Sequence, residues 1–156
     1  MSGGGSGGHV FPAIAIADAI KKIAPDTEFL FIGALGKIEM TAVPKAGYAI
    51  EGLTIAGLQR RITLKNLLFP FKLLLSLIKA WFMVKRFKPN AAIGTGGYAS
   101  GAALKVAQWQ GVPSFVQEQN AFPGITNKLL SKKVSSVFAA YPGLEKYFEA
   151  SKIQIT

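Results

Sequence analysis

The segment AAIGTGGYASGAALKVAQWQG, residues 91–111, combines an apolar strand, a glycine turn and an alanine-rich helix, in that order. The chain opens with a related stretch, MSGGGSGGHVFPAIAIADAI, in which a glycine turn leads into a helix expected over residues 11–23. Ile16 and Ile20 lie one helical turn apart there, and Pro12 suits a first turn. The repeated pattern is typical of folds in which strands and helices alternate.

The rest of the chain continues this alternation. Strands are expected at residues 28–33, 48–53, 112–120, 134–140 and 152–156, and helices at 38–47, at about 64 or 70 to 87, and at 123–133. The strands are apolar runs, which indicates a parallel sheet that is covered on both faces. The sequence therefore predicts an α/β fold with a Rossmann-like, doubly wound parallel sheet in one domain of residues 1–156.

The amino-acid composition restricts the kinds of site and ligand that this chain can have. The 156 residues include no cysteine, which excludes disulfides and thiolate metal sites, and the formal net charge is +10. No Asp or Glu lies between Gly52 and Gln117, although half of the 18 basic residues do. This asymmetry favours an anionic partner, such as a phosphorylated ligand, nucleic acid or an acidic lipid surface.

Two glycine turns have similar chemistry. SGGH at residues 6–9 and TGGY at 95–98 each place a hydroxyl, two glycines and a polar ring at a helix start. At the carboxyl edge of a parallel sheet, the free N–H groups of such turns suit a phosphate or a developing anion. The alternative is a tight turn without a ligand, because glycine provides positive φ in either case. Neither turn continues as a Walker loop or a nicotinamide-binding motif, which argues against nucleotide hydrolysis and dehydrogenase chemistry.

Further polar residues stand close to these turns. His9, which is the only histidine, lies at a helix start, where it is either structural or a general base. QEQN, residues 117–120, places four polar side chains at the end of a strand. Such a cluster is either a capping turn formed by Asn120 or a site for sugar hydroxyls, with Glu118 as acceptor or accessory base.

The expected helix that ends near residue 87 is both basic and apolar. Cations recur in it every seven residues, at Lys65, Lys72, Lys79 and Arg86. A membrane span conflicts with the lysines inside the apolar run, and full burial would require their stems to snorkel. We therefore expect one face to pack on the sheet and the other to meet an anionic bilayer, with contacts from Lys72, Leu75, Lys79, Trp81, Phe82 and Arg86. The long apolar face suits lipid better than nucleic acid.

GGGSGGHVFPAIAIADAI, FIGALGKIEMTAVPKAGY and GTGGYASGAALKVAQWQGVPSFVQEQNAFPGITNKLLSKK together resemble the N-terminal domain of the MurG glycosyltransferase family. The resemblance covers essentially the whole chain and implies one half of a two-domain GT-B architecture. It implies transfer of N-acetylglucosamine, with inversion, from UDP-N-acetylglucosamine to the C4 hydroxyl of the muramyl sugar of lipid I (undecaprenyl-pyrophosphoryl-MurNAc-pentapeptide). The product is lipid II, made for peptidoglycan at the cytoplasmic face of the bacterial inner membrane. The resemblance implies neither a cofactor nor a metal ion.

The resemblance also implies roles for single positions. His9 would be the base for the attacking hydroxyl, Glu118 an accessory catalytic group, and Gln119 a residue that orients sugar groups. The residues lining the UDP-N-acetylglucosamine side would be Ser6, Gly7, Gly8 and Asn120. The acceptor diphosphate would lie by the second loop, at Thr95, Gly96, Gly97, Tyr98 and Ser100.

Two residues depart from the family pattern, because Ser6 replaces the usual threonine and Gln117 stands where many relatives have histidine. From the sequence we expect the strand before the first glycine turn to be missing and KIQIT to come before any donor domain, and we therefore expect this chain alone to be inactive. The alternatives are a non-catalytic membrane-associated module that binds lipid-linked diphosphates and a related glycolipid glycosyltransferase.

Overall fold

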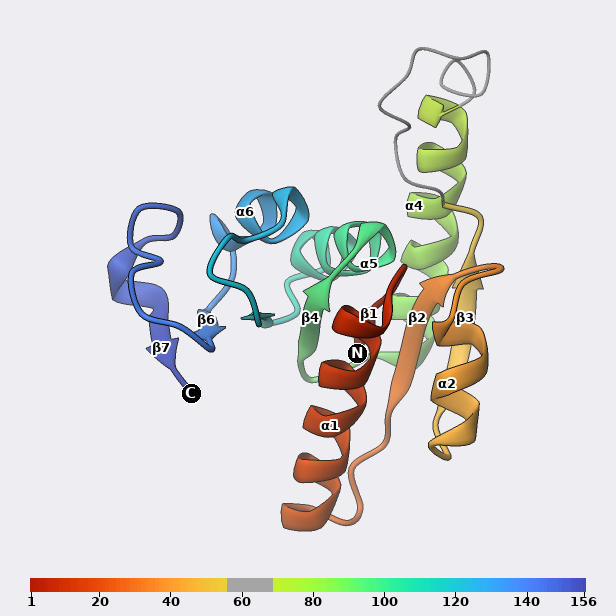
Figure 1. The fold of residues 1–156 in the computed structure, drawn as a ribbon. Helices are drawn as coiled ribbons and strands as arrows, with labels where there is room; N and C mark the ends of the chain where they lie inside the picture. Colours follow the sequence, from red (N-terminus) through yellow and green to blue (C-terminus); the bar gives the residue numbers. More distant parts are fainter. Residues whose placement is uncertain (56–68) are drawn as a thin grey trace.

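The computed structural model describes residues 1–55 and 69–156, in which strands and helices alternate (Figure 1). The strands are β1 (Ser2–Gly3), β2 (Leu30–Ala34), β3 (Ala49–Leu53), β4 (Ala92–Gly96), β5 (Ser114–Glu118), β6 (Ser136–Ala139) and β7 (Ile153–Ile155). The helices are α1 (Gly7–Ile23), α2 (Glu39–Lys45), α4 (Phe69–Phe87), α5 (Tyr98–Trp109), α6 (Ile125–Ser131) and a short 3₁₀ turn, Ala150–Lys152. Every strand and helix predicted from the sequence is present; the predicted helix start near residue 64 lies outside the described residues.

The strands form a parallel arrangement in two hydrogen-bonded groups, β1-β4-β5-β6-β7 and β2-β3. The groups meet at Met1, whose amino group donates to the Leu30 carbonyl at 2.9 Å and whose carbonyl accepts from the Ile32 N–H at 3.0 Å. The spatial order is therefore 3-2-1-4-5-6-7, which is the doubly wound Rossmann order. The predicted fold class is confirmed.

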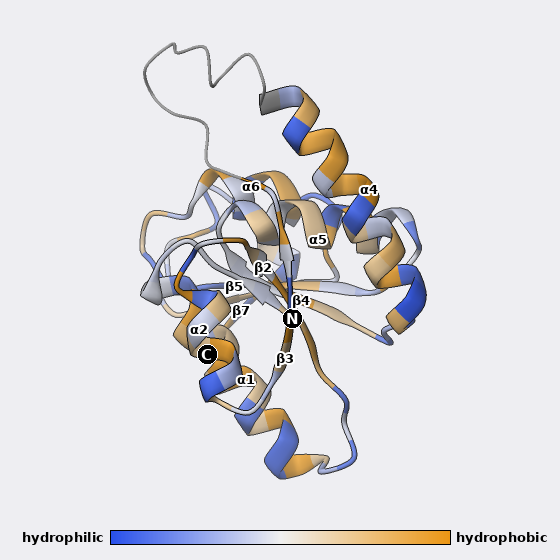
Figure 2. Cartoon of the chain, turned by 90° about the vertical axis from the view of Figure 1, so that its right-hand side faces the viewer, coloured by the Kyte–Doolittle hydropathy of each residue, from blue (hydrophilic) through white to orange (hydrophobic). Residues whose placement is uncertain are grey.

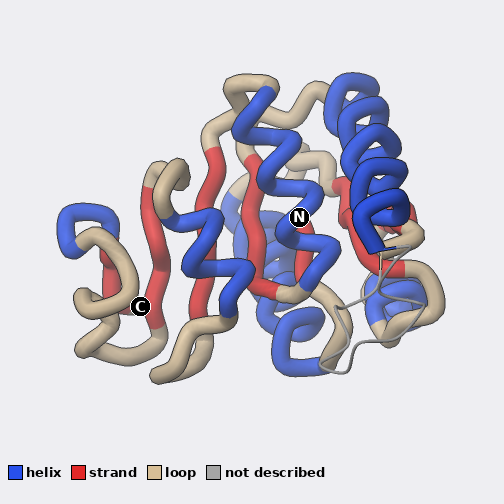
Figure 3. Tube along the Cα trace, turned by 90° about the horizontal axis from the view of Figure 1, so that it is seen from above, coloured by secondary structure: helices blue, strands red, loops and turns tan. Residues whose placement is uncertain are grey.

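Helices cover both faces of the sheet (Figure 3). On one face, α1 and α2 pack on β2 through side chains that include Val10, Val43 and Phe31. On the other face, α4 and α5 pack on β2 and β3, while α5 and α6 pack on β5 and β6. Leu104 of α5 and Val116 of β5 belong to the latter cluster. This layering leaves the ends of the strands as the places where loops can form a site.

The strand before the first glycine turn, expected to be missing, is present as the two residues of β1. Ser2 pairs with Gly94 and Gly3 with Gly96 of β4. The Ser2 hydroxyl donates to the Ile32 carbonyl of β2 at 2.7 Å. The first residues of the chain therefore lie in the middle of the sheet and hold β2 and β4 together (Figure 1).

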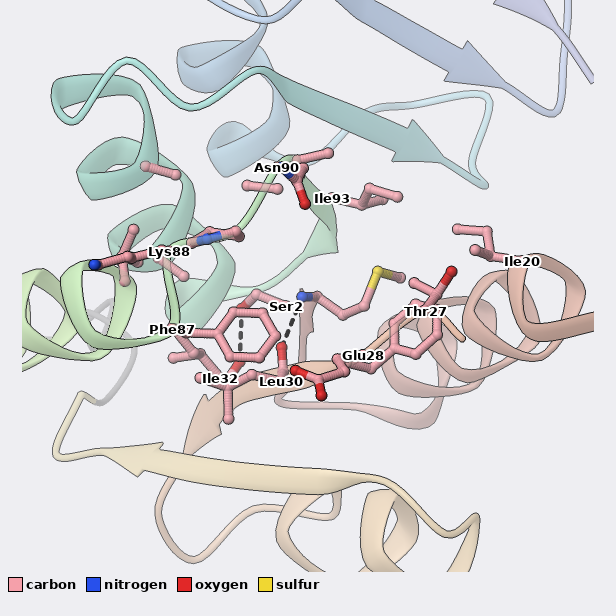
Figure 4. A pocket seen from close by; sticks show the side chains of 18 of the residues that line it. Ser2, Ile20, Thr27, Glu28, Leu30, Ile32, Phe87, Lys88, Asn90 and Ile93 are labelled. Atoms are coloured by element: carbon pink, nitrogen blue, oxygen red, sulfur yellow. Dashed lines mark hydrogen bonds between the residues drawn. The ribbon is translucent and has the colours of Figure 1, made fainter. Parts of the chain in front are cut away.

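A cavity of about 690 Å³ opens between β2 and β4, at the amino ends of these strands. Figure 4 shows Ser2, Leu30 and Ile32 on its wall, with Ile93 and Asn90 opposite. The α-amino group of Met1 stands where the amide of a longer β1 strand would continue the ladder. Burial lowers the pKa of this amino group to about 5, although Met1 as a residue is only half-buried.

Helix α1 begins four residues earlier than the sequence indicates, at Gly7. Pro12 therefore lies inside the helix and not in its first turn. Because proline has no N–H, it cannot donate to the carbonyl of Gly8, four residues before it. The Gly8 carbonyl oxygen therefore lacks the hydrogen-bond donor that residue 12 of a helix usually provides.

Neutralising the Met1 amino group is expected to stabilise the fold. Its pKa is about 5 in the folded chain against 8 ordinarily, so stability falls as the pH drops from 8 to 5, where only the unfolded chain takes up the proton. A difference of about 3 in pKa corresponds to at most about 4 kcal/mol, and the partial exposure of Met1 reduces this. Urea unfolding at pH 5.5 and pH 8 measures the change. An N-acetylated chain is the control, and an equal pH dependence in both would contradict the expectation.

Candidate active site

The two glycine turns touch each other, backbone against backbone. The Gly4 N–H donates to the Gly96 carbonyl at 3.2 Å. A Cβ on Gly97 would overlap the Gly4 carbonyl oxygen, and one on Gly3 would overlap the Thr95 hydroxyl. Gly96 and Gly97 also have φ angles of 112° and 89°, which residues with side chains rarely adopt. The predicted position of both turns at the carboxyl edge of the sheet is observed, and the structure adds that they touch and that glycine is required at the contact.

His9 lies between the two turns and is half-buried. Its Nδ1 atom lies 2.9 Å from the Thr95 carbonyl oxygen, and the Thr95 hydroxyl donates to the His9 carbonyl at 2.6 Å. Gly96 lies so close to the ring that a Cβ there would be 2.7 Å from Nδ1. Since a carbonyl only accepts, the Nδ1 contact is a hydrogen bond when Nδ1 carries the proton, and the Nε2 lone pair is then available to a ligand.

Gln119, just after β5, has its amide nitrogen turned toward both loops. This nitrogen lies 2.7 Å from the Gly8 carbonyl oxygen, 2.7 Å from His9 Nδ1 and 3.3 Å from the Thr95 carbonyl oxygen. The side chain thus connects the end of β5 to the start of α1 and the end of β4. Its predicted role in orienting sugar groups stays a prediction.

Glu118 is buried, with 1% of its surface exposed. Its carboxylate accepts hydrogen bonds from the Asn120 N–H at 3.0 Å, the Asn120 amide at 2.9 Å, the Gly124 N–H at 3.3 Å and the Asn127 amide at 2.8 Å. These bonds hold the loop that follows β5 and leave Asn120 exposed at the edge of the site. The catalytic role predicted for Glu118 stays a prediction, and the hydrogen bonds of its carboxylate are with the loop and with Asn127 of α6.

The remaining predicted residues divide into exposed and buried groups. Ser6 is exposed, and its hydroxyl makes no capping bond to α1 within the described chain. Gly8 and Tyr98 are also exposed, whereas Gly7 and Gly97 are half-buried. The buried members are Thr95, Gly96 and Ser100. Thr95 and Ser100 therefore face the protein interior, and the accessible residues of the second loop are Gly97 and Tyr98, whose contact with a ligand stays a prediction.

Glu39, which the sequence analysis did not single out, supports the first loop. It is fully buried, and its two carboxylate oxygens accept from the Ala34 N–H at 2.9 Å and the Gly5 N–H at 3.0 Å. A Cβ on Gly4 would overlap this carboxylate. In the sequence Glu39 looks like an ordinary acidic residue of a helix first turn, and only its place five residues after the end of a buried strand hints at this use.

The arrangement combines a candidate base with anion-binding backbone. The first amides of α1 and α5 have no acceptor inside their helices, and both helices begin at this edge. Such helix starts stabilise negative charge. Within residues 1–55 and 69–156, no three His, Cys, Asp or Glu side chains gather into a metal-binding group. The chemistry that fits is proton removal beside a bound phosphate.

Helix α4 has a second, solvent-facing apolar side (Figure 2). Its exposed apolar residues are Phe71, Leu74, Leu75, Ile78, Trp81 and Phe82, which we call the α4 outer face. Lys72 is exposed beside it, whereas Lys79 donates to the Gly52 carbonyl at 2.7 Å and Arg86 pairs with Glu51. One face of α4 packs on the sheet as predicted and the other is exposed, whereas contact of the exposed face with a bilayer stays a prediction. None of the helices in the described part of the chain is long and apolar enough to span a membrane.

The glycosyltransferase family 28 N-terminal domain matches residues 1–139 of this chain. Over all 156 residues, the chain is 57% identical to the Flavobacterium psychrophilum UDP-N-acetylglucosamine–N-acetylmuramyl-(pentapeptide) pyrophosphoryl-undecaprenol N-acetylglucosamine transferase. It is 53% identical to the protein of the same name from Phocaeicola vulgatus. The chain spans 42% of the length of each of these relatives.

Solved structures agree with this similarity. The crystal structure of MurG from Acinetobacter baumannii matches the entire chain with a TM-score of 0.82 and 29% identity, over 44% of that protein. The glycosyltransferase SsfS6 from Streptomyces sp. SF2575 matches 91% of the chain, and the chain covers 49% of it, with a TM-score of 0.62 and 18% identity. The second likeness concerns the fold alone.

Replacing Gly97 by alanine is expected to destabilise the fold by at least about 2 kcal/mol, because the new Cβ meets the Gly4 backbone and the φ of 89° is strained. Chemical denaturation measures the loss. The matched control is Gly124→Ala, since Gly124 has a φ of −63° and no described atom lies within 4 Å of a Cβ there. Equal stability of the two variants would contradict the expectation.

Proposed function

The chain belongs to the glycosyltransferase family 28 N-terminal domain family, and from this premise we propose that it is the acceptor-side part of an N-acetylglucosaminyltransferase that converts lipid I to lipid II. The relatives that match it over its whole length carry the name of that activity. The observation that carries the proposal is the position of His9, whose Nδ1 contacts Thr95 between two helix starts that suit a diphosphate.

The proposed reaction is a direct displacement. His9 Nε2 removes the proton from the C4 hydroxyl of the muramyl sugar as the oxygen attacks the anomeric carbon of N-acetylglucosamine. The bond from that carbon to the β-phosphate oxygen of UDP breaks, UDP leaves with the electron pair, and the configuration inverts. The base and the leaving group stand on opposite sides of the transferred sugar.

Backbone amides supply the electrostatic stabilisation in this proposal. The exposed start of α1 at Ser6 and Gly8, together with Asn120, faces the sugar nucleotide. The start of α5 at Gly97 and Tyr98 faces the diphosphate of the lipid acceptor. Fixed N–H dipoles need no rearrangement as charge develops, which is why such sites accelerate group transfer.

The α4 outer face is the proposed membrane contact, at an anionic surface on the cytoplasmic side of the inner membrane. Helix α4 runs antiparallel to the parallel strands, so it begins at the same edge of the sheet as the glycine turns (Figure 1). Six exposed apolar residues beside Lys72 match the chemistry of a helix that lies in a lipid headgroup region. A lipid-linked acceptor held by this face would have its diphosphate near α5.

A chimera tests the catalytic proposal. The matching segment of the Flavobacterium psychrophilum relative is replaced by this chain, and transfer from radiolabelled UDP-N-acetylglucosamine to a short-chain lipid I analogue is measured. We expect activity in the chimera and a loss of about 10²- to 10⁴-fold on His9→Ala, because the base is removed. Gln110→Ala, on the opposite end of α5, is the control. Full activity of the His9 variant, or an inactive chimera that still binds the lipid, would contradict the proposal.

Vesicle flotation tests the membrane contact. Replacing Leu75 and Phe82 by serine is expected to weaken binding to phosphatidylglycerol vesicles more than tenfold, since each apolar side chain contributes about 1.5–3 kcal/mol when fully buried. The control pair is Ile23→Ser and Phe122→Ser, which are 86% and 77% exposed but lie outside α4. Equal losses in both pairs, or equal binding to neutral vesicles, would argue against the α4 outer face.

A further inference from the structure

We propose that the cavity between β2 and β4 is a binding site for a short, extended apolar peptide, which lies parallel to both strands and continues the line of β1. The ligand is a segment of about four residues that ends in a free carboxylate beside Met1. This inference goes beyond the proposed transfer activity, because the cavity lies at the amino ends of the strands and the glycine turns lie at their carboxyl ends.

The wall formed by β2 directs backbone hydrogen-bonding groups into the cavity. The Leu30 carbonyl accepts from the Met1 amino group at 2.9 Å. In a strand the N–H and the carbonyl of one residue point to the same side, so the Leu30 N–H also points toward the line of β1. The Met1 carbonyl is already used by the Ile32 N–H at 3.0 Å. An acceptor for the Leu30 N–H must therefore come from the cavity.

The facing wall, on β4, has the same character. The Ala92 N–H donates to the Pro113 carbonyl at 2.8 Å, on the side of β5. The next residue, Ile93, therefore directs its N–H to the opposite side, toward the line of β1. Figure 4 shows Ile93 across the cavity from Leu30. Since β1 itself fits between β2 and β4 directly beyond the cavity, the space between the two walls is one strand wide.

An extended peptide matches both walls at once. Along β1 the partners alternate, because Met1 bonds to β2 and Ser2 pairs with β4. If this alternation continues backwards from Met1, the carboxylate of the last peptide residue accepts from the Ile93 N–H. The carbonyl of the residue before it accepts from the Leu30 N–H. An acyl chain has no backbone carbonyls at this spacing and would leave buried N–H groups unpaired.

The side chains around the cavity indicate that the peptide is apolar. Successive side chains of a strand point to opposite faces of the sheet. On one face α1 contributes Ile20 to the lining, and on the other α4 and α5 contribute Val84, Phe87 and Leu104. A strand covered by apolar side chains on both faces is itself a continuous apolar run. The charged lining residue Lys88 is exposed, so a polar first residue of the peptide can remain in water.

A titration followed by nuclear magnetic resonance tests the site. The peptide acetyl-Lys-Val-Ile-Val, with a free carboxylate, is added to the nitrogen-15-labelled chain. We expect saturable shifts of the Leu30 and Ile93 amide signals and at least tenfold slower hydrogen exchange at both, because each N–H gains a buried acceptor. The Gly97 amide, at the other end of the sheet, is expected to remain unchanged. The same peptide made of D-residues is the matched control, since its side chains and carbonyls cannot follow the line of β1, and we expect no binding.

A second arm fills the cavity covalently. Joining Val-Ile-Val through a peptide bond to the Met1 amino group is expected to weaken binding of the free peptide at least tenfold, because the joined residues occupy its place. Undiminished binding to this extended chain would overturn the proposal, as would the absence of binding to the unmodified chain. Equal shifts at Leu30 and Ile93 with octanoate would also overturn it, because they would show a site for an apolar carboxylate without a backbone. None of these outcomes depends on transfer activity.

Discussion

The contact between the two glycine turns is the constraint on which the site depends. The Gly4 backbone lies against Gly96 and Gly97 so closely that no side chain fits between them. This approach brings α1 and α5 to one edge of the sheet and places His9 against the Thr95 carbonyl. A pair of parallel strands alone would put the two turns near each other, but only glycine allows them to share hydrogen bonds.

Buried carboxylates hold the loops in this geometry. Glu39 fixes Gly5 of the first turn, and Glu118 fixes the segment that follows β5. Both use backbone N–H groups as partners, which satisfies the charges without a cation. Much of the polar chemistry at this edge therefore maintains the scaffold. The groups that remain for a ligand are the exposed Ser6 and Asn120, the ring of His9 and the first amides of two helices.

The sequence predicted the fold well because apolar runs and glycine turns are local signals, and they alternate with predicted helices along the chain. It predicted the convergence of both turns because parallel strands end at one edge. It did not predict β1, since a strand of two residues has no periodicity, nor the early start of α1, since glycine is a poor helix former. The inward orientation of Gln119 depends on Gly8, which lies far along the chain and which no local pattern contains. The partners of Glu118 lie within nine residues of it, but the sequence does not show that they turn toward its carboxylate.

Pro12 illustrates how one local rule acts at a distance. Its missing N–H leaves the Gly8 carbonyl without a helical donor, and a side chain from the opposite part of the chain occupies that acceptor. The same side chain then reaches the His9 ring and the Thr95 carbonyl. A defect in the hydrogen bonding of α1 is thus the physical reason why the end of β5 is coupled to the candidate base. An uninterrupted helix would satisfy its own carbonyl, and the Gln119 amide nitrogen would lose the Gly8 oxygen from the three atoms that it contacts.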